Sequence, residues 1–130
     1  MARTYLIVAG LMWVVYGIYL LVAPQVLAGT AGVAATNLTG LIELRAMYGG
    51  LEIAVGAFAL TAAGVPGMLR SGLLAMGFAC AGLGVTRLLS ATAAAEFSTY
   101  TRQGLALELT LTVLAVWLYL RQGRAVAGHT

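Results

Sequence analysis

Five charged residues stand inside apolar stretches of this sequence, and they are the groups most able to do chemistry. Three are carboxylates, Glu43, Glu52 and Glu108, and two are arginines, Arg45 and Arg87. Ionisable residues within membrane-type segments are rare; they face a protein interior, pair with one another and mark binding or transport sites. The sequence therefore predicts a buried polar cluster, which is either a structural ion network or a pocket for a small ligand.

Other kinds of site find little support in the residue types. The only histidine is His129, near the end of the sequence, and the only cysteine is Cys80, so no tetrahedral metal site is expected. No histidine stands near a serine to act as its base, and the glycines lie within apolar segments rather than in a phosphate-binding loop. We therefore expect no metal, no cofactor and no catalytic residue.

The composition predicts a membrane protein. Of the 130 residues, 62% are hydrophobic and 8% are charged. Soluble domains are about 25% charged, so this chain lacks the charge that a water-facing surface needs. The seven arginines are scattered and make no basic stripe, so nucleic acid is not an expected partner. The expected partner is the lipid bilayer.

Four apolar segments are long enough to cross a bilayer, which takes about 20 residues. They are residues 5–23, 41–63, 71–91 and 104–120. We predict an all-α fold, a single domain over residues 1–130 in which four transmembrane helices form a compact bundle. The first linking segment, residues 24–40, is uncharged, and within it Asn37 is placed to cap the second helix.

The placement of arginines predicts the orientation. With four spans, both termini and the second loop lie on one side of the membrane. That side carries Arg3, Arg70, Arg121 and Arg124. On the other side, residues 24–40 carry no charge and residues 92–103 carry Glu96 and Arg102. Because cytoplasmic loops are enriched in arginine and lysine, we expect both termini in the cytoplasm, with the protein in the bacterial inner membrane. The five embedded charges then lie in the outer half of the bundle.

Helical spacing predicts that these charges face the bundle interior. Residues three, four or seven apart share a helix face, and glycines at such spacing let membrane helices approach closely. Glu52 shares a face with Gly49 and Gly56, and Arg87 shares one with Gly84. Each arginine is expected within about 4 Å of a glutamate carboxylate. The predicted ligand-binding or ion-network residues are Glu43, Arg45, Tyr48, Glu52, Arg87 and Glu108.

The ten residues from Glu43 to Glu52, ELRAMYGGLE, resemble the signature of a known family. Together with Pro24 after the first helix, Arg87 late in the third and Glu108 early in the fourth, they are similar to an uncharacterised bacterial family of small four-helix membrane proteins, the domain of unknown function 4345. The similarity covers almost the whole chain. It implies the fold and the membrane location, and it implies no activity.

Three kinds of function fit these residues. The leading interpretation is a non-enzymatic protein that binds a small amphipathic ligand or a lipid, or that serves as an accessory subunit beside a membrane-protein partner. The second is a small proton-coupled transporter that acts as a homo-oligomer, specifically a dimer. Small multidrug exporters have a similar length and four spans, but they use an acidic residue in the first helix, and residues 5–23 contain none. The third is an intramembrane isomerase with Glu52 and Glu108 as acid and base.

Overall fold

The computed structural model describes the backbone of residues 1–127 and the side chains of residues 1–122. The side chain of Arg124 and the whole of His129 lie outside these described residues. The elements in chain order are α1 (Ala2–Val22), α2 (Val26–Thr30), α3 (Leu38–Leu44), a π-helical segment η1 (Arg45–Gly50), α4 (Leu51–Gly64), α5 (Leu69–Ala94) and α6 (Thr99–Ala127). Helices α3, η1 and α4 follow one another without a break, so they form one long helix.

Four helices are long and apolar enough to span a membrane. They are Ala2–Val22, Leu38–Gly64, Leu69–Ala94 and Thr99–Gln122. The described residues contain no strand, so the predicted all-α fold with four membrane helices is confirmed, and the chain is a multi-pass membrane protein. Each helix extends beyond its predicted apolar range at one or both ends, because backbone hydrogen bonding continues into the flanking polar residues.

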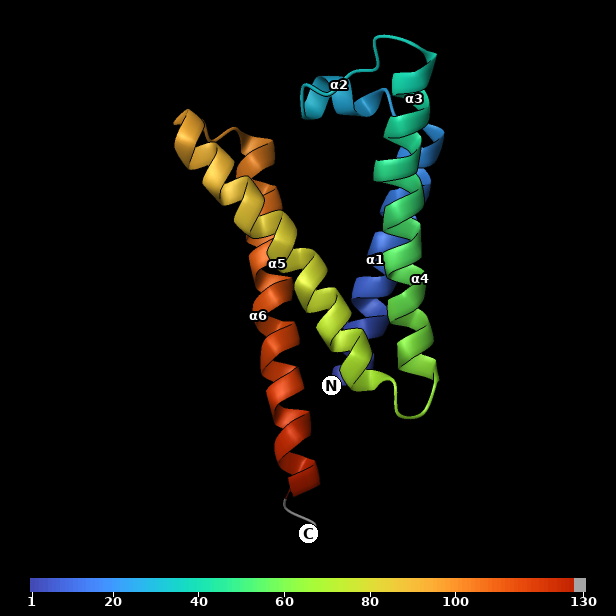
Figure 1. Cartoon of the computed structure of the whole chain (residues 1–130), viewed down its shortest axis with the longest axis vertical. Helices are drawn as coiled ribbons and strands as arrows, with labels where there is room; N and C mark the ends of the chain where they lie inside the picture. The colour runs from blue at the N-terminus through green and yellow to red at the C-terminus, as the bar shows by residue number, and fades with distance from the viewer. Residues whose placement is uncertain (128–130) are drawn as a thin grey trace.

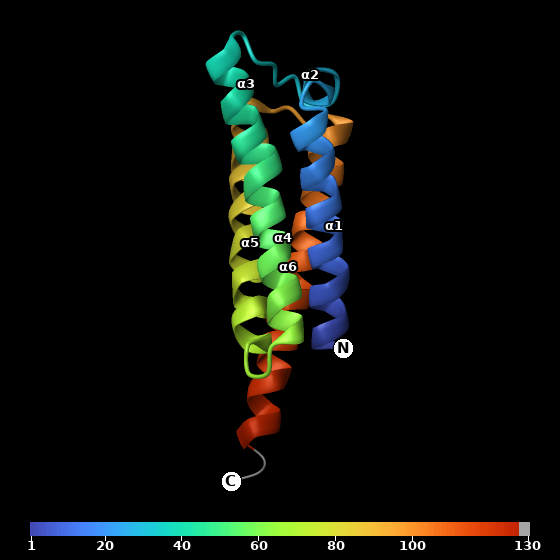
Figure 2. The same ribbon diagram turned by 90° about the vertical axis from the view of Figure 1, so that its right-hand side faces the viewer.

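The long helices form two antiparallel pairs. Helix α1 packs along α4, and α5 packs along α6 (Figures 1 and 2). The two pairs meet where α1 begins and α6 ends, and they diverge toward α2, which lies across the other end (Figure 1). We call the first of these the closed end and the second the open end.

Glycines allow α1 and α4 to pack with their backbones in contact. A Cβ atom added to Gly56 would lie 2.6 Å from the carbonyl oxygen of Gly10. One added to Gly17 would lie 2.9 Å from the carbonyl oxygen of Gly49. Small residues at such crossings maximise van der Waals contact between membrane helices. The predicted role of the seven-residue glycine spacing is therefore confirmed for this pair.

At the closed end, one hydrogen bond ties the two helix pairs together and another joins the two helices of the first pair. The Tyr5 hydroxyl of α1 donates a hydrogen bond to the Leu111 carbonyl of α6, with the oxygens 2.8 Å apart. Nearby, the Arg3 Nε atom donates to the Ala63 carbonyl at 2.8 Å. The buried apolar core lies at the same level and includes Leu6, Leu73, Met76, Cys80 and Leu118.

Arginines stack on aromatic rings at the closed end. The Arg70 guanidinium carbon lies 4.4 Å from the centre of the Tyr119 ring, and that of Arg121 lies 4.2 Å from the centre of the Trp117 ring. Aromatic and cationic side chains are enriched where helices leave the hydrocarbon for the headgroup region. These pairs therefore mark the membrane boundary at this end.

The helix from Leu38 to Gly64 has a capped start and a widened middle. The Asn37 side-chain oxygen accepts a hydrogen bond from the Gly40 backbone nitrogen at 2.8 Å, so the predicted cap is confirmed. In the π-helical segment η1, backbone hydrogen bonds join residues five apart rather than four. One extra residue in a turn corresponds to about 100° of rotation. Residues before η1 therefore face a different direction from the one that continuous α-helical spacing predicts.

Candidate functional site

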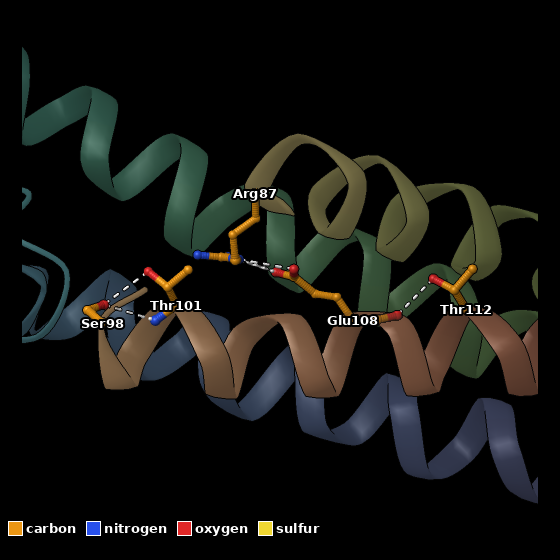
Figure 3. Close-up of polar contacts among 5 residues, drawn as sticks. All are labelled: Arg87, Ser98, Thr101, Glu108 and Thr112. Atoms are coloured by element: carbon orange, nitrogen blue, oxygen red, sulfur yellow. Dashed lines mark hydrogen bonds and ion pairs between the residues drawn. The ribbon is translucent and has the colours of Figure 1, made fainter. Parts of the chain in front are cut away.

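An ion pair joins α5 to α6 in the half of the bundle nearer the open end. The Arg87 Nη2 atom lies 2.7 Å from Oε1 of Glu108, and Arg87 Nε donates to both carboxylate oxygens at 3.1 and 3.0 Å. Figure 3 shows the arginine reaching from α5 across to α6. Glu108 is 7% exposed. The prediction that Arg87 lies within ion-pair distance of a glutamate is confirmed.

Glycines make room for this ion pair on both helices. A Cβ atom on Gly104 would lie 3.0 Å from Nε of Arg87, so the guanidinium passes directly over the α6 backbone. A Cβ atom on Gly84 would lie 3.3 Å from Cβ of Glu108. Helix α6 begins just before this region, where the Ser98 hydroxyl accepts a hydrogen bond from the Thr101 backbone nitrogen (Figure 3).

Glu52 lies on the other helix pair and forms no ion pair with any side chain that the structure describes. Its Oε2 atom is buried and has no hydrogen-bond partner among the described residues. The side chain packs against α1, where a Cβ atom on Gly17 would lie 3.0 Å from Cβ of Glu52. The Tyr16 hydroxyl lies within electrostatic range of the Glu52 carboxyl. Glu52 is therefore a half-buried acceptor with one oxygen unused.

Two tyrosines lie near these groups. The Tyr16 hydroxyl lies near the hydroxyl of Tyr100 on α6, and the Arg87 guanidinium carbon is 5.7 Å from the centre of the Tyr100 ring. We call Tyr16, Glu52, Arg87, Tyr100 and Glu108 the polar cluster. Its members come from all four long helices.

Sequence reasoning missed the two tyrosines of the polar cluster. A signal for Tyr100 is present, because Tyr100, Gly104 and Glu108 follow one another at four-residue spacing and so share one face of α6. Tyr16 has no comparable signal. It is an aromatic residue near the end of an apolar helix, which is the usual position for a membrane-interface tyrosine.

Two predicted site residues, Glu43 and Arg45, are not part of the cluster. Both are exposed, and the Arg45 side chain forms no ion pair among the described residues. The expectations that Arg45 pairs with a glutamate and that both charges face the interior are wrong. The cause is η1, because its extra residue rotates Arg45 away from the face of Glu52.

Tyr48 is neither exposed like Glu43 and Arg45 nor a member of the polar cluster. It is half-buried and within electrostatic range of Arg87, and it donates no hydrogen bond to a glutamate in the part of the chain with described side chains.

Two surface hollows lie away from the cluster. One of about 460 Å³ lies beside α2 and is lined by Pro24, Asn37 and Leu44, among others. Another of about 480 Å³ lies between α1 and α6 at the closed end, and its lining includes Tyr5 and Trp117. Both are mainly apolar, so neither brings ionisable groups together.

The chemistry open to the polar cluster is recognition of a polar group. Both Glu108 oxygens accept hydrogen bonds from Arg87, so this carboxylate is already engaged. Glu52 keeps one buried oxygen for a donor. Within the described residues, no group of three or more histidine, cysteine, aspartate or glutamate side chains is placed to hold a metal ion.

Comparison with known proteins gives a family and nothing finer. No curated protein and no solved structure matches the chain. One family model does match, and it covers residues 1–119, which include α1 to α5, α6 as far as Tyr119 and every residue of the polar cluster. With so much of its length matched, the chain belongs to the family described as Domain of unknown function (DUF4345).

Proposed function

We propose that this membrane protein binds the polar head of a small amphipathic molecule, or of a lipid, at the polar cluster. The observation that carries the proposal is the buried Oε2 atom of Glu52, which has no hydrogen-bond partner among the described residues. A buried acceptor without a donor costs about 1–3 kcal/mol, so a ligand that brings a donor to this oxygen gains that free energy.

The depth of the cluster favours a ligand with an apolar tail. Glu52 lies about 18 Å along the helix axis from Gly64, and Arg87 lies about 10 Å before the end of α5, at 1.5 Å per residue. The hydrocarbon layer is about 30 Å thick, so these groups lie inside it, on the side of the open end. A ligand that reaches these groups from the bilayer therefore needs an apolar part of its own.

A role as an accessory subunit is the second candidate, and the exposure of Glu43 and Arg45 favours it. Two charges on the outer surface of a membrane helix are a natural contact for a partner protein or for a second copy of the chain. The isomerase and the proton-coupled transporter have less support. An isomerase needs Glu108 free to exchange protons, and Arg87 engages both of its oxygens.

For location, we propose the bacterial inner membrane with both termini in the cytoplasm. The support is the arginine distribution, since Arg3, Arg70 and Arg121 gather at the closed end, and cytoplasmic boundaries are the ones enriched in arginine. In this orientation the polar cluster lies in the leaflet away from the cytoplasm.

The test of the ligand site is Glu52→Gln, with Glu96→Gln in the exposed loop before α6 as the matched control. The amide nearly preserves the shape of the carboxyl and still accepts hydrogen bonds, so we expect the fold and the melting temperature to be kept. Native mass spectrometry of the purified protein should show a lipid-sized adduct on the wild type and on Glu96→Gln, and none on Glu52→Gln. A stable Glu52→Gln protein with unchanged bound material rules out the site.

A further inference from the structure

The polar cluster is unbalanced in charge. Arg87 is its one cation, and Glu52 and Glu108 are its two carboxylates, so the formal charges sum to one negative charge. The arginine donates from Nε and Nη2 to Glu108 in a two-point pair, in which the two formal charges balance. In this formal count the unbalanced carboxyl is Glu52, on the opposite helix pair.

Among the described residues, Glu52 has a tyrosine as a neighbour and forms no ion pair. The nearby polar neighbour is the Tyr16 hydroxyl, and the rings of Tyr16 and Tyr19 lie 6.5 Å apart. These rings are 40% and 48% exposed, so both remain open to a ligand. The faces of tyrosine rings attract cations, and a carboxylate beside them attracts the same charge.

We infer that the headgroup bound at this site is cationic, an ammonium group that donates hydrogen bonds to the Glu52 carboxylate and lies beside the Tyr16 ring. The inference rests on the proposed function, since it names the chemical class of that ligand. An amine brings both of the things that Glu52 lacks, a positive charge and N–H donors. An anionic headgroup would meet the unpaired carboxylate and a guanidinium that is already engaged.

An ammonium group of this kind has two sources. One is an aminolipid such as phosphatidylethanolamine, and the other is a free amphipathic amine. Both present the same donors to Glu52, so they share one recognition chemistry.

The first experiment uses three probes with the same twelve-carbon chain and different heads: dodecylammonium, dodecanol and dodecanoate. The full chain is placed in nanodiscs made only of phosphatidylcholine, and binding is followed by the shift in melting temperature and by calorimetry. We expect dodecylammonium to stabilise the wild type and Glu96→Gln. Its affinity for Glu52→Gln should be lower by about tenfold or by more than that, because the amide keeps the acceptor and removes the charge.

The outcomes separate this inference from the proposed function. Preferential binding of dodecanoate or dodecanol, lost in Glu52→Gln or Arg87→Gln, would overturn the cationic headgroup and leave the amphiphile site standing. Equal effects of all three probes on the wild type and on both variants would overturn the site as well, since this is simple partitioning into the bilayer.

The second experiment identifies the source. Nanodiscs that mix phosphatidylethanolamine with phosphatidylcholine are compared with phosphatidylcholine alone. If the aminolipid raises the melting temperature of the wild type and displaces dodecylammonium, and does neither in Glu52→Gln, the ligand is a lipid of the bilayer. If dodecylammonium binds as well in both membranes, the site takes a free amine.

Discussion

Arg87 on α5 and Glu108 on α6 form a bidentate pair in which one guanidinium engages both carboxylate oxygens, with the closest N–O distance 2.7 Å. The two residues are 21 positions apart in the chain, and the pair fixes the register between the last two helices. It is the one ion pair among the residues whose side chains are described.

Removing Arg87 should destabilise the protein strongly. Arg87→Ala leaves Glu108, which is 7% exposed, without a partner. Stranding one charge of a buried pair costs about 3–5 kcal/mol, and we expect the lower end because Arg87 is partly exposed. Unfolding in detergent, followed by circular dichroism, measures this loss. The control is Arg102→Ala in an exposed arginine, and equal tolerance of both changes would show that Arg87 is hydrated.

Replacing both partners together should lower the free energy of unfolding by less than the sum of the two single changes. In the double variant Arg87→Met, Glu108→Met, no charge is stranded, and two flexible apolar side chains occupy the space. The free energies of unfolding of the wild type, the two single variants and the double variant form a cycle. We expect a coupling free energy of about 2 kcal/mol or more, as for residues in direct contact. Simple additivity would mean that the pair does not form.

The contact between α1 and α4 should depend on the absence of side-chain atoms at Gly56. In Gly56→Ala, the new Cβ would lie 2.6 Å from the Gly10 carbonyl oxygen and 2.8 Å from Cγ2 of Val14, so the helices must move apart. We expect a clearly lower melting temperature. The control is Gly82→Ala, where nothing lies within 4 Å of the added atom. Alanine is a better helix former there by about 1 kcal/mol, so the control should be neutral or stabilised.

The orientation can be tested by fusing an alkaline phosphatase, which is active only outside the cytoplasm. A fusion after Thr130 should be inactive, and one in the loop after Glu96 should be active. The reason is the gathering of Arg3, Arg70 and Arg121 at the closed end. The reverse pattern would place the polar cluster in the leaflet facing the cytoplasm.

The fold was predictable because its signals are local. Length and apolar composition identify a membrane helix without reference to any other part of the chain, and all four helices were found in this way. The cap at Asn37 is equally local, since a side chain and a backbone nitrogen three residues later are enough to form it. Helix ends were less well placed, because apolar runs stop before the backbone hydrogen bonds do.

The site was predictable only in part, because it depends on how helices rotate and tilt. That Arg87 pairs with a glutamate followed from its depth and its small neighbours, whereas the choice of Glu108 as its partner came from the structure. The direction predicted for Arg45 was wrong because a single widened turn in η1 changes the helical phase. The residue types from Arg45 to Gly50 do not indicate this turn. The divergence of the two helix pairs has no sequence signature either, so the arrangement of the pairs could not be foreseen.

The widened turn in η1 also has a consequence for how related chains should be compared. The segment from Arg45 to Gly50 holds one residue more than an α-helical path needs, which is the geometry that inserting one residue into an α-helix would produce. A relative that lacks this residue would keep the contact of α4 with α1 and would turn only the part of the helix before η1. Length differences of one residue are therefore expected at this point. When such chains are aligned, the helix face of the residues before η1 should be compared separately from that of the residues after it.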